Sequence, residues 1–260
     1  MWVGGQVDQV ADADSQTALE YHASGEYGIA RFDGQTGAFL SWFMHPDAGT
    51  GLVATPTTAA DNKLNAYCSL GPDNRVYVSM GNPSLGKRRI IYRYELDGTA
   101  APGAGRSGAV FADGSSYGGT LEYIDRPLTF TDDYVYVAGG ARIGGDLDRG
   151  ALRYNYDGSP AGTRANPDPS VDPRFTADLA KFGYGVALDA SDNVYLSDGS
   201  QVDRFDTVGD PAGSPWVNPS EGARFLAFDD AGRLYVAGIA AIDRYDRAGD
   251  PAGTVAGDPN

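Results

Sequence analysis

Short runs of alternating hydrophobic and polar residues recur along the chain, separated by turns that contain Asp or Gly. The clearest two repeats begin at Val186 and Leu226, and each holds three strand-like runs followed by a weaker fourth one. Alternation with a period of two is typical of half-buried β-strands. No amphipathic run with helical spacing and ten or more residues interrupts the repeats. The pattern therefore predicts an all-β protein.

An arginine followed by an aromatic residue marks the third strand-like run of every repeat. The motif occurs five times, with successive arginines 62, 60, 51 and 40 residues apart. Four-stranded repeats of about 40 to 60 residues are the sequence signature of a β-propeller. We therefore predict one propeller domain over residues 1–260, with about five four-stranded blades at 7–44, 64–103, 119–162, 182–215 and 222–255. The motif arginines are Arg31, Arg93, Arg153, Arg204 and Arg244.

The number of blades in the ring is left open by the repeats. Five units fit a five-bladed ring, and they also fit part of a larger one. A strand-like segment from Trp2 to Val7 precedes the first unit, and its pairing with the last blade would close the ring and remove exposed sheet edges. A β-sandwich fits less well, because its strands do not repeat a fixed motif.

At these repeats, and most clearly over residues 182–253, the chain resembles the NHL-repeat and related six-bladed propellers. Families of this group include gluconolactonase-like and virginiamycin-lyase-like proteins. The resemblance implies a propeller fold, and in lactonase- or lyase-like members a divalent cation held on the axis by Glu, Asp and Asn side chains. Propellers also serve in binding and as scaffolds, so the fold alone does not decide the function.

The charge of the chain restricts its partners. It has 35 acidic and 20 basic residues, a net charge of -15, and would be repelled by a phosphate backbone. No run of about 18 apolar residues is present. We therefore expect no nucleic-acid partner and no membrane insertion. The single Cys68 excludes an intrachain disulfide. No signal peptide is recognisable, yet an extracellular or cell-surface location is expected.

Aromatic residues at or near the starts of the inner strands are the first candidate ligand site. These residues are expected to line the central channel of a propeller. An aromatic platform for a sugar or another flat ligand is one interpretation, and simple filling of the channel neck is the other. The candidates are Tyr67, Tyr123, Tyr184 and Phe225.

Carboxylates in the longer loops are candidate ligands for Ca²⁺ or another divalent cation, which prefers oxygen ligands. Glu122 and His45 are also weak candidates for acid–base catalysis. Asp189 and Asp229 recur at one position of the repeat, which favours a role in turns instead. The candidate metal ligands are Asp61, Glu122, Asp146, Asp148 and Glu221.

Two further repeated features receive structural interpretations. The motif arginines are expected to pair with Asp residues of the same or the adjacent blade. The sequence Gly-Asp-Pro-Ala-Gly, at Gly209 and again at Gly249, has the composition of a β-turn with Pro in second position.

Two functions follow as alternatives. The first is a non-catalytic binding or scaffold module that recognises a glycan, a protein or a second copy of itself. It is favoured because the chain lacks a nucleophile elbow and a His-Glu-x-x-His motif. The alternative is a divalent-metal-dependent enzyme of lactonase or lyase type with an axial metal.

Overall fold

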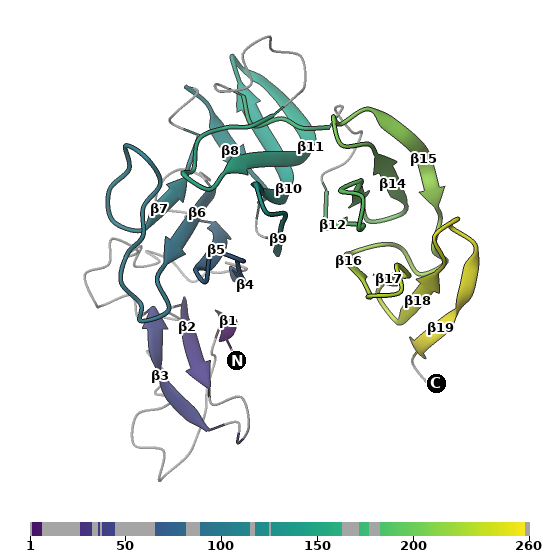
Figure 1. Ribbon diagram of the computed structural model, residues 1–260, viewed down its shortest axis with the longest axis horizontal. Coiled ribbons are helices and arrows are strands. Elements are labelled where there is room, and N and C mark those ends of the chain that lie inside the picture. Colours follow the sequence, from purple (N-terminus) through teal and green to yellow (C-terminus); the bar gives the residue numbers. More distant parts are fainter. Residues whose placement is uncertain are drawn as a thin grey trace.

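The described part of the protein is an all-β propeller, as predicted. The computed structural model describes residues 2–6, 27–32, 36, 38–44, 66–81, 89–114, 118–124, 126–162, 172–176 and 183–257. Over these residues it contains strands β1 to β19, which form four hydrogen-bonded sheets. The sheets follow one another in an open arc around a common axis (Figure 1).

The first sheet contains β1 (Trp2–Gln6), β2 (Tyr27–Phe32) and β3 (Phe39–Met44). β1 pairs antiparallel with β2, from Trp2 opposite Arg31 to Gln6 opposite Tyr27. The prediction that this N-terminal segment pairs with the last blade is therefore wrong. Its backbone groups are already bonded within the first sheet, so the first and last sheets stand at the two ends of the arc (Figure 1).

The second and third sequence units form one eight-stranded sheet instead of two separate blades. The short β8 joins them, because it pairs with β10 and, through Leu121 opposite Arg89, with β6. Because β10 is long, its far end can pair with β8, which also pairs with β6. The described residues therefore form four sheets, where the sequence predicted about five blades. The strands are β4 (Ala66–Leu70), β5 (Val76–Gly81), β6 (Arg89–Tyr94), β7 (Val110–Ala112), β8 (Thr120–Glu122), β9 (Leu128–Phe130), β10 (Tyr134–Ile143) and β11 (Asp146–Asn155).

The last two sheets are regular four-stranded antiparallel blades. The first of them contains β12 (Gly185–Leu188), β13 (Val194–Ser197), β14 (Val202–Phe205) and β15 (Pro211–Val217). The second contains β16 (Phe225–Phe228), β17 (Leu234–Ala237), β18 (Ala241–Tyr245) and β19 (Pro251–Gly257).

The expected Asp-Pro-Ala-Gly turns are wrong by a few residues. Pro211 and Pro251 begin the edge strands β15 and β19, where a residue without an N–H group costs little. The turn before Pro211 is made by Asp206, whose Oδ1 accepts the backbone N–H groups of Val208 at 3.0 Å and Asp210 at 2.9 Å. Asp246 makes the equivalent turn before Pro251.

The inner strands β1, β4, β9, β12 and β16 stand in this order around the axis, and neighbours contact one another. Hydroxyl groups connect them. Thr129 Oγ1 donates to the Val186 carbonyl at 2.8 Å, and Ser197 Oγ donates to the Arg224 carbonyl at 3.2 Å. Gly185 permits the closest approach, since a Cβ there would lie 2.6 Å from the Arg224 carbonyl oxygen.

Aromatic side chains fill the spaces between successive units. The tyrosine in the second strand of a unit packs at an angle against an aromatic ring of the following unit. Tyr77 meets Phe130 at 5.1 Å and Tyr195 meets Phe228 at 4.9 Å between ring centroids. The repeated aromatic position therefore stabilises the contacts between units.

The motif arginines also have a structural role, but among those with described side chains none forms the expected ion pair with Asp. Arg93, only 5% exposed, donates its Nε to the Ala101 carbonyl at 2.8 Å and its Nη2 to the Pro102 carbonyl at 2.8 Å. The guanidinium lies 4.8 Å from the Phe111 ring centroid. Backbone carbonyls and π faces, not carboxylates, thus hold this buried cation.

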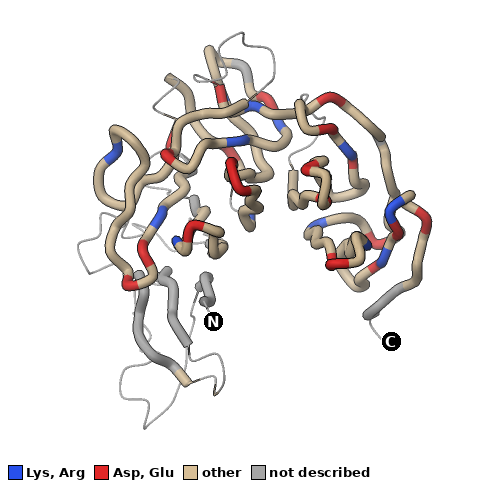
Figure 2. The backbone as a smooth tube through the Cα atoms, viewed as in Figure 1, with Lys and Arg blue, Asp and Glu red and all other residues tan. Residues whose placement is uncertain are grey.

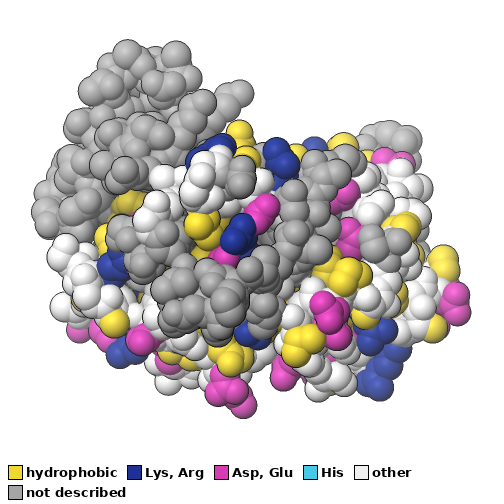
Figure 3. Space-filling model, turned by 90° about the horizontal axis from the view of Figure 1, so that it is seen from above, with side chains coloured by type: hydrophobic (Ala, Val, Ile, Leu, Met, Phe, Trp, Pro, Cys, Tyr) yellow, Lys and Arg dark blue, Asp and Glu magenta, His cyan; other side chains and the backbone are white. Residues whose placement is uncertain are grey.

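Charged residues of both signs are interspersed over the described sheets (Figure 2). On the face shown in Figure 3, hydrophobic side chains lie in small groups between charged ones. Within the described ranges no helix is long and apolar enough to cross a membrane.

Candidate functional site

Two predicted channel residues meet at the axis. Tyr67 pairs opposite Ser79 and Phe225 pairs opposite Ala237, so they hold the same position in their repeats. Their ring centroids are 6.1 Å apart with planes tilted by 48°, although β4 and β16 are far apart in sequence. Gly185 occupies the equivalent position of β12, where the absence of a side chain lets the backbone at Phe225 approach closely.

A cation and a third aromatic ring form a second pair, just before β9 and β12, at the same end of the inner strands. The Arg126 guanidinium stands 4.7 Å from the Tyr184 ring centroid, and Tyr184 is 37% exposed. The Ser79 hydroxyl donates to the Arg126 carbonyl, which fixes the segment before β9 next to Tyr67. We call Tyr67, Arg126, Tyr184 and Phe225 the axial mouth. It combines exposed π faces with a guanidinium that can donate to an oxygen-rich ligand.

Tyr123, the fourth predicted aromatic residue, is not part of this group. It follows β8 with φ 55, the left-handed region that non-glycine residues rarely adopt, and its side chain is 45% exposed. Gly139 accommodates this turn, because a Cβ there would lie 2.7 Å from Ile124 Cγ2. Such strain costs on the order of 1–3 kcal/mol and is concentrated at functional sites. A ligand-binding role for Tyr123 stays a prediction.

The candidate metal ligands whose side chains are described, Glu122, Asp148 and Glu221, are not gathered into one site. Glu122 lies 3.6 Å from Arg142 Nε, and Asp148 forms an ion pair with Arg174. Glu221 follows the turn that leads into β16, and its backbone carbonyl accepts the Ile239 N–H at 3.2 Å. Asp146 is the first residue of β11. His45 and Asp61 lie outside the described residues.

Within the described ranges, no three His, Cys, Asp or Glu residues come together in a way that could hold a metal ion. The described side chains at the axial mouth are aromatic or cationic, which is not the oxygen-donor set that a divalent cation needs. These residues therefore do not fit the axial metal that the family resemblance implies.

The predicted turn role of Asp189 is confirmed. Its Oδ1 accepts the N–H groups of Ser191 at 2.8 Å and Asn193 at 3.1 Å, and its Oδ2 accepts the Tyr195 hydroxyl at 3.2 Å. Burial alone would raise the pKa of this carboxyl, but the hydrogen bonds outweigh it and leave the pKa below its ordinary value. Asp229 makes the same bonds in the next sheet.

Sequence reasoning missed Arg126 and the serines that support the mouth. One signal was available, because Ser79 and Ser197 both follow the second-strand tyrosine by two residues. Both are fully buried, and both donate to the carbonyl of an arginine that precedes the next inner strand, Arg126 or Arg224. The repeated serine thus holds the segments just before β9 and β16.

No family model matches the chain, and no curated protein does so either. Among solved structures, a gluconolactonase from Xanthomonas campestris is similar with a TM-score of 0.58 and 16% identity, covering 89% of this chain and 69% of that chain. The PQQ-bound form of an aldose sugar dehydrogenase from Streptomyces coelicolor has a TM-score of 0.51, 17% identity and coverages of 89% and 75%.

Virginiamycin B lyase from Staphylococcus aureus matches with a TM-score of 0.41, 12% identity and coverages of 90% and 64%. The gluconolactonase and the aldose sugar dehydrogenase, at 16% and 17% identity, show a shared propeller fold. The resemblance seen in the repeats is confirmed at that level, while the activity has to be argued from the site.

Proposed function

We propose that the axial mouth binds a sugar lactone, or the sugar acid formed from it, and that the chain hydrolyses such a lactone. The observation that carries the proposal is the mouth itself, where Tyr67 and Phe225 form one pair of rings and the Arg126 guanidinium lies against the Tyr184 ring. Aromatic faces pack against the apolar C–H faces of sugar rings. A guanidinium donates strong hydrogen bonds to carbonyl and carboxylate oxygens.

Two similar folds support this class of ligand. By their names, one is a gluconolactonase and the other an aldose sugar dehydrogenase. Both therefore act on sugars or sugar lactones. Since they share only the fold with this chain, they support the ligand class and leave the reaction to be tested.

In such a reaction, Arg126 would donate to the lactone carbonyl oxygen and stabilise the negative charge that develops on it. The three rings would hold the sugar ring over the channel and restrict its orientation. Because Glu122 and Asp148 are paired with arginines, we assign no step to a divalent cation. Ca²⁺ or another divalent metal stays a proposal that rests on residues such as Asp61.

A non-catalytic function at the same mouth is the second candidate. It is favoured because the described residues bring no group of carboxylates together there. In that case the mouth would recognise a glycan or a free sugar acid without turnover. The expected extracellular or cell-surface location fits either function and is likewise a proposal.

Hydrolysis of D-glucono-δ-lactone, followed in a pH-stat against the spontaneous rate, tests the proposal. Parallel runs contain EDTA, Ca²⁺, Mg²⁺ or Zn²⁺. We expect turnover, and a kcat/KM lower by about tenfold or more in Arg126→Gln, because a charge-assisted hydrogen bond is lost. Arg233→Gln removes an exposed charge of the last sheet and serves as the control.

Calorimetric titration with gluconate separates the outcomes. Binding that Tyr67→Ala weakens, without any turnover, would support the second candidate in place of the first. Absence of both turnover and binding of lactone, gluconate or glucose would overturn both.

A further inference from the structure

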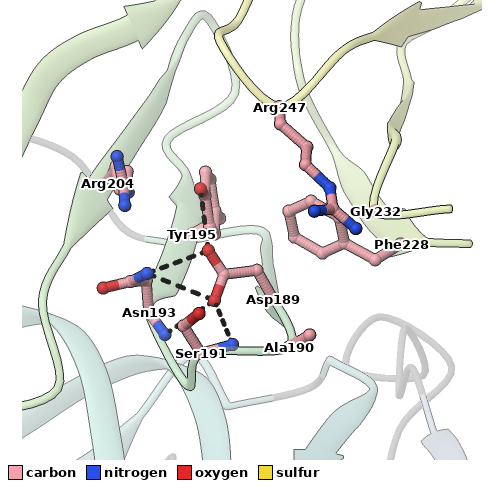
Figure 4. A pocket seen from close by; sticks show the side chains of 9 residues that line it. All are labelled: Asp189, Ala190, Ser191, Asn193, Tyr195, Arg204, Phe228, Gly232 and Arg247. Carbon is pink, nitrogen blue, oxygen red and sulfur yellow. Dashed lines mark hydrogen bonds between the residues drawn. The ribbon is translucent and has the colours of Figure 1, made fainter. Parts of the chain in front are cut away.

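A pocket recurs between neighbouring sheets at the end of the inner strands opposite to the axial mouth. One copy, with a volume of about 210 Å³, lies between the β12–β15 and β16–β19 sheets (Figure 4). A second copy, of about 370 Å³, lies between the β9–β11 unit and the β12–β15 sheet. We call them the 4/5 pocket and the 3/4 pocket, after the sequence units that form them.

The two pockets are built from the same positions of the repeat but differ in charge. In each, the earlier unit contributes its second-strand tyrosine and its motif arginine, while the later one contributes two turn residues. Those two are Gly232 and Arg247 in the 4/5 pocket and Asp192 and Thr207 in the 3/4 pocket. The 4/5 pocket is therefore lined by two arginines and one aspartate, and the 3/4 pocket by one arginine and three aspartates.

Arg204 in the 4/5 pocket differs from the other described motif arginines. Arg93, Arg153 and Arg244 each donate Nε to the carbonyl of the alanine eight residues later, at 2.8, 2.5 and 3.0 Å. Arg204 has Ala212 at that spacing, yet its buried Nε finds no hydrogen-bond partner in the described structure. Its guanidinium lies 5.8 Å from the Tyr195 ring centroid and interacts with the Tyr195 hydroxyl, so it lines the pocket while its Nε stays without a partner.

Arg247 supplies the second cation from the neighbouring sheet. Figure 4 shows it extending from its turn towards Phe228 and Asp189. Gly232 makes this position possible, because a Cβ there would lie 2.4 Å from Arg247 Nε. Its only described hydrogen bond is a long one, from Nε to the Ala231 carbonyl at 3.3 Å. The terminal nitrogens of this side chain thus remain available to a ligand.

The one carboxylate in the 4/5 pocket does not neutralise these arginines. Asp189 is occupied by the N–H groups of Ser191 and Asn193, the Asn193 side-chain amide and the Tyr195 hydroxyl. No ion pair joins it to Arg204 or Arg247 among the described side chains. Two guanidinium groups therefore line this space, and neither forms an ion pair with a described carboxylate.

We propose that the 4/5 pocket is a binding site for a small oxyanion, a carboxylate or a phosphate group, held between Arg204 and Arg247. Arginine forks donate two parallel hydrogen bonds to such groups. Tyr195 and Phe228 form the walls on which the apolar part of a ligand would rest. The 3/4 pocket, with three aspartates, would reject the same ligand.

Thermal unfolding in sodium phosphate, sodium acetate and sodium chloride at equal ionic strength tests this site. A ligand that binds only the folded state raises the melting temperature with its concentration. We expect phosphate, acetate or both to raise it above the chloride value. Arg247→Gln, at an exposed position, should weaken the apparent Kd by about tenfold, the loss of one charge-assisted hydrogen bond.

Two further variants separate specific binding from a general charge effect. Arg233→Gln removes one charge from the first turn of the last sheet, where Arg233 pairs with Asp229, and should change the Kd by less than about twofold. Arg204→Lys keeps the charge but loses the fork, and should weaken binding like Arg247→Gln. Equal melting temperatures in all three salts, or equal effects of Arg247→Gln and Arg233→Gln, would overturn the proposal.

Discussion

The ionised carboxylate of Asp189 stabilises the turn between β12 and β13. Its carboxylate accepts hydrogen bonds from the turn it belongs to and from the Tyr195 hydroxyl of the following strand. Burial raises the pKa of Tyr195 to about 12, so this hydroxyl stays protonated and keeps donating over the whole neutral range. One turn residue thereby connects the β12–β13 hairpin with the wall of the 4/5 pocket.

Acid should lower the free energy of unfolding partly by protonating Asp189. The pKa of Asp189 is lower in the folded state than in the unfolded chain, so its contribution is present above the unfolded value of about 3.9 and is lost as pH falls through the folded value. Asp189→Asn should cost about 1–2 kcal/mol at pH 7 and flatten the dependence below pH 5. Urea unfolding at pH 7, 5 and 3 measures the loss of stability at pH 7 and its dependence on pH. Asp192→Asn, in the same turn, is the control.

Arg93 gives the sharpest test of the motif arginines. Arg93→Lys keeps the charge but leaves the carbonyls of Ala101, which is buried, and Pro102 without their donors. We expect a loss of about 2–4 kcal/mol in the free energy of unfolding. Arg233→Lys, whose side chain is 45% exposed, should change it by less than about 0.5 kcal/mol. A small effect at Arg93 would contradict its structural role.

At the scale of strands, the packing of neighbouring inner strands places the residues of the mouth. β12 and β16 approach closely only because Gly185 has no side chain, and this contact sets where Phe225 lies. The hydroxyl of Ser197 then bonds the Arg224 carbonyl across the same contact. Small residues at these positions matter as much for the site as the aromatic ones.

A methyl group at Gly185 should therefore separate the last two sheets. In Gly185→Ala the new Cβ would meet the Arg224 carbonyl oxygen at 2.6 Å, and we expect a loss of about 1–3 kcal/mol in stability. Gly213→Ala in β15, where the nearest atom is Trp216 Cδ1 at 3.3 Å, should cost less than about 1 kcal/mol. Chemical denaturation of the two variants gives the comparison, and equal losses would argue against the close strand contact.

At the scale of the whole molecule, the arc brings the second and last sequence units together across the axis. Tyr67 and Phe225 belong to strands that share no hydrogen bonds, and only the curvature of the arc places their rings 6.1 Å apart. The contact between these two rings therefore forms only if the sheets are arranged in this arc.

A double-mutant cycle measures that contact. Tyr67→Ala and Phe225→Ala should show a coupling of about 0.5–1.5 kcal/mol, as for other aromatic pairs. Combining Tyr67→Ala with Val208→Ala, an exposed residue in a turn of the β12–β15 sheet, should be additive. Zero coupling between Tyr67 and Phe225 would mean that the mouth is open in solution.

Much of the fold was determined by the sequence itself, because each unit repeats the same local chemistry. Alternation predicted the strands, the repeated arginine–aromatic pair predicted the propeller, and Asp189 and Asp229 were correctly assigned to turns. These features depend on neighbours in the chain, so a single sequence reveals them. The candidate aromatic residues of the mouth followed from the same repeat.

Only the tertiary structure decided which of these residues meet. β1 was expected to pair with the last blade and pairs with β2 instead, and β8 joins two units into one sheet, because strand partners depend on long-range geometry. Arg126 is placed by a serine hydroxyl from another strand. Arg204 was one repeated arginine among five in the sequence, and packing between sheets left it with an unpaired buried donor.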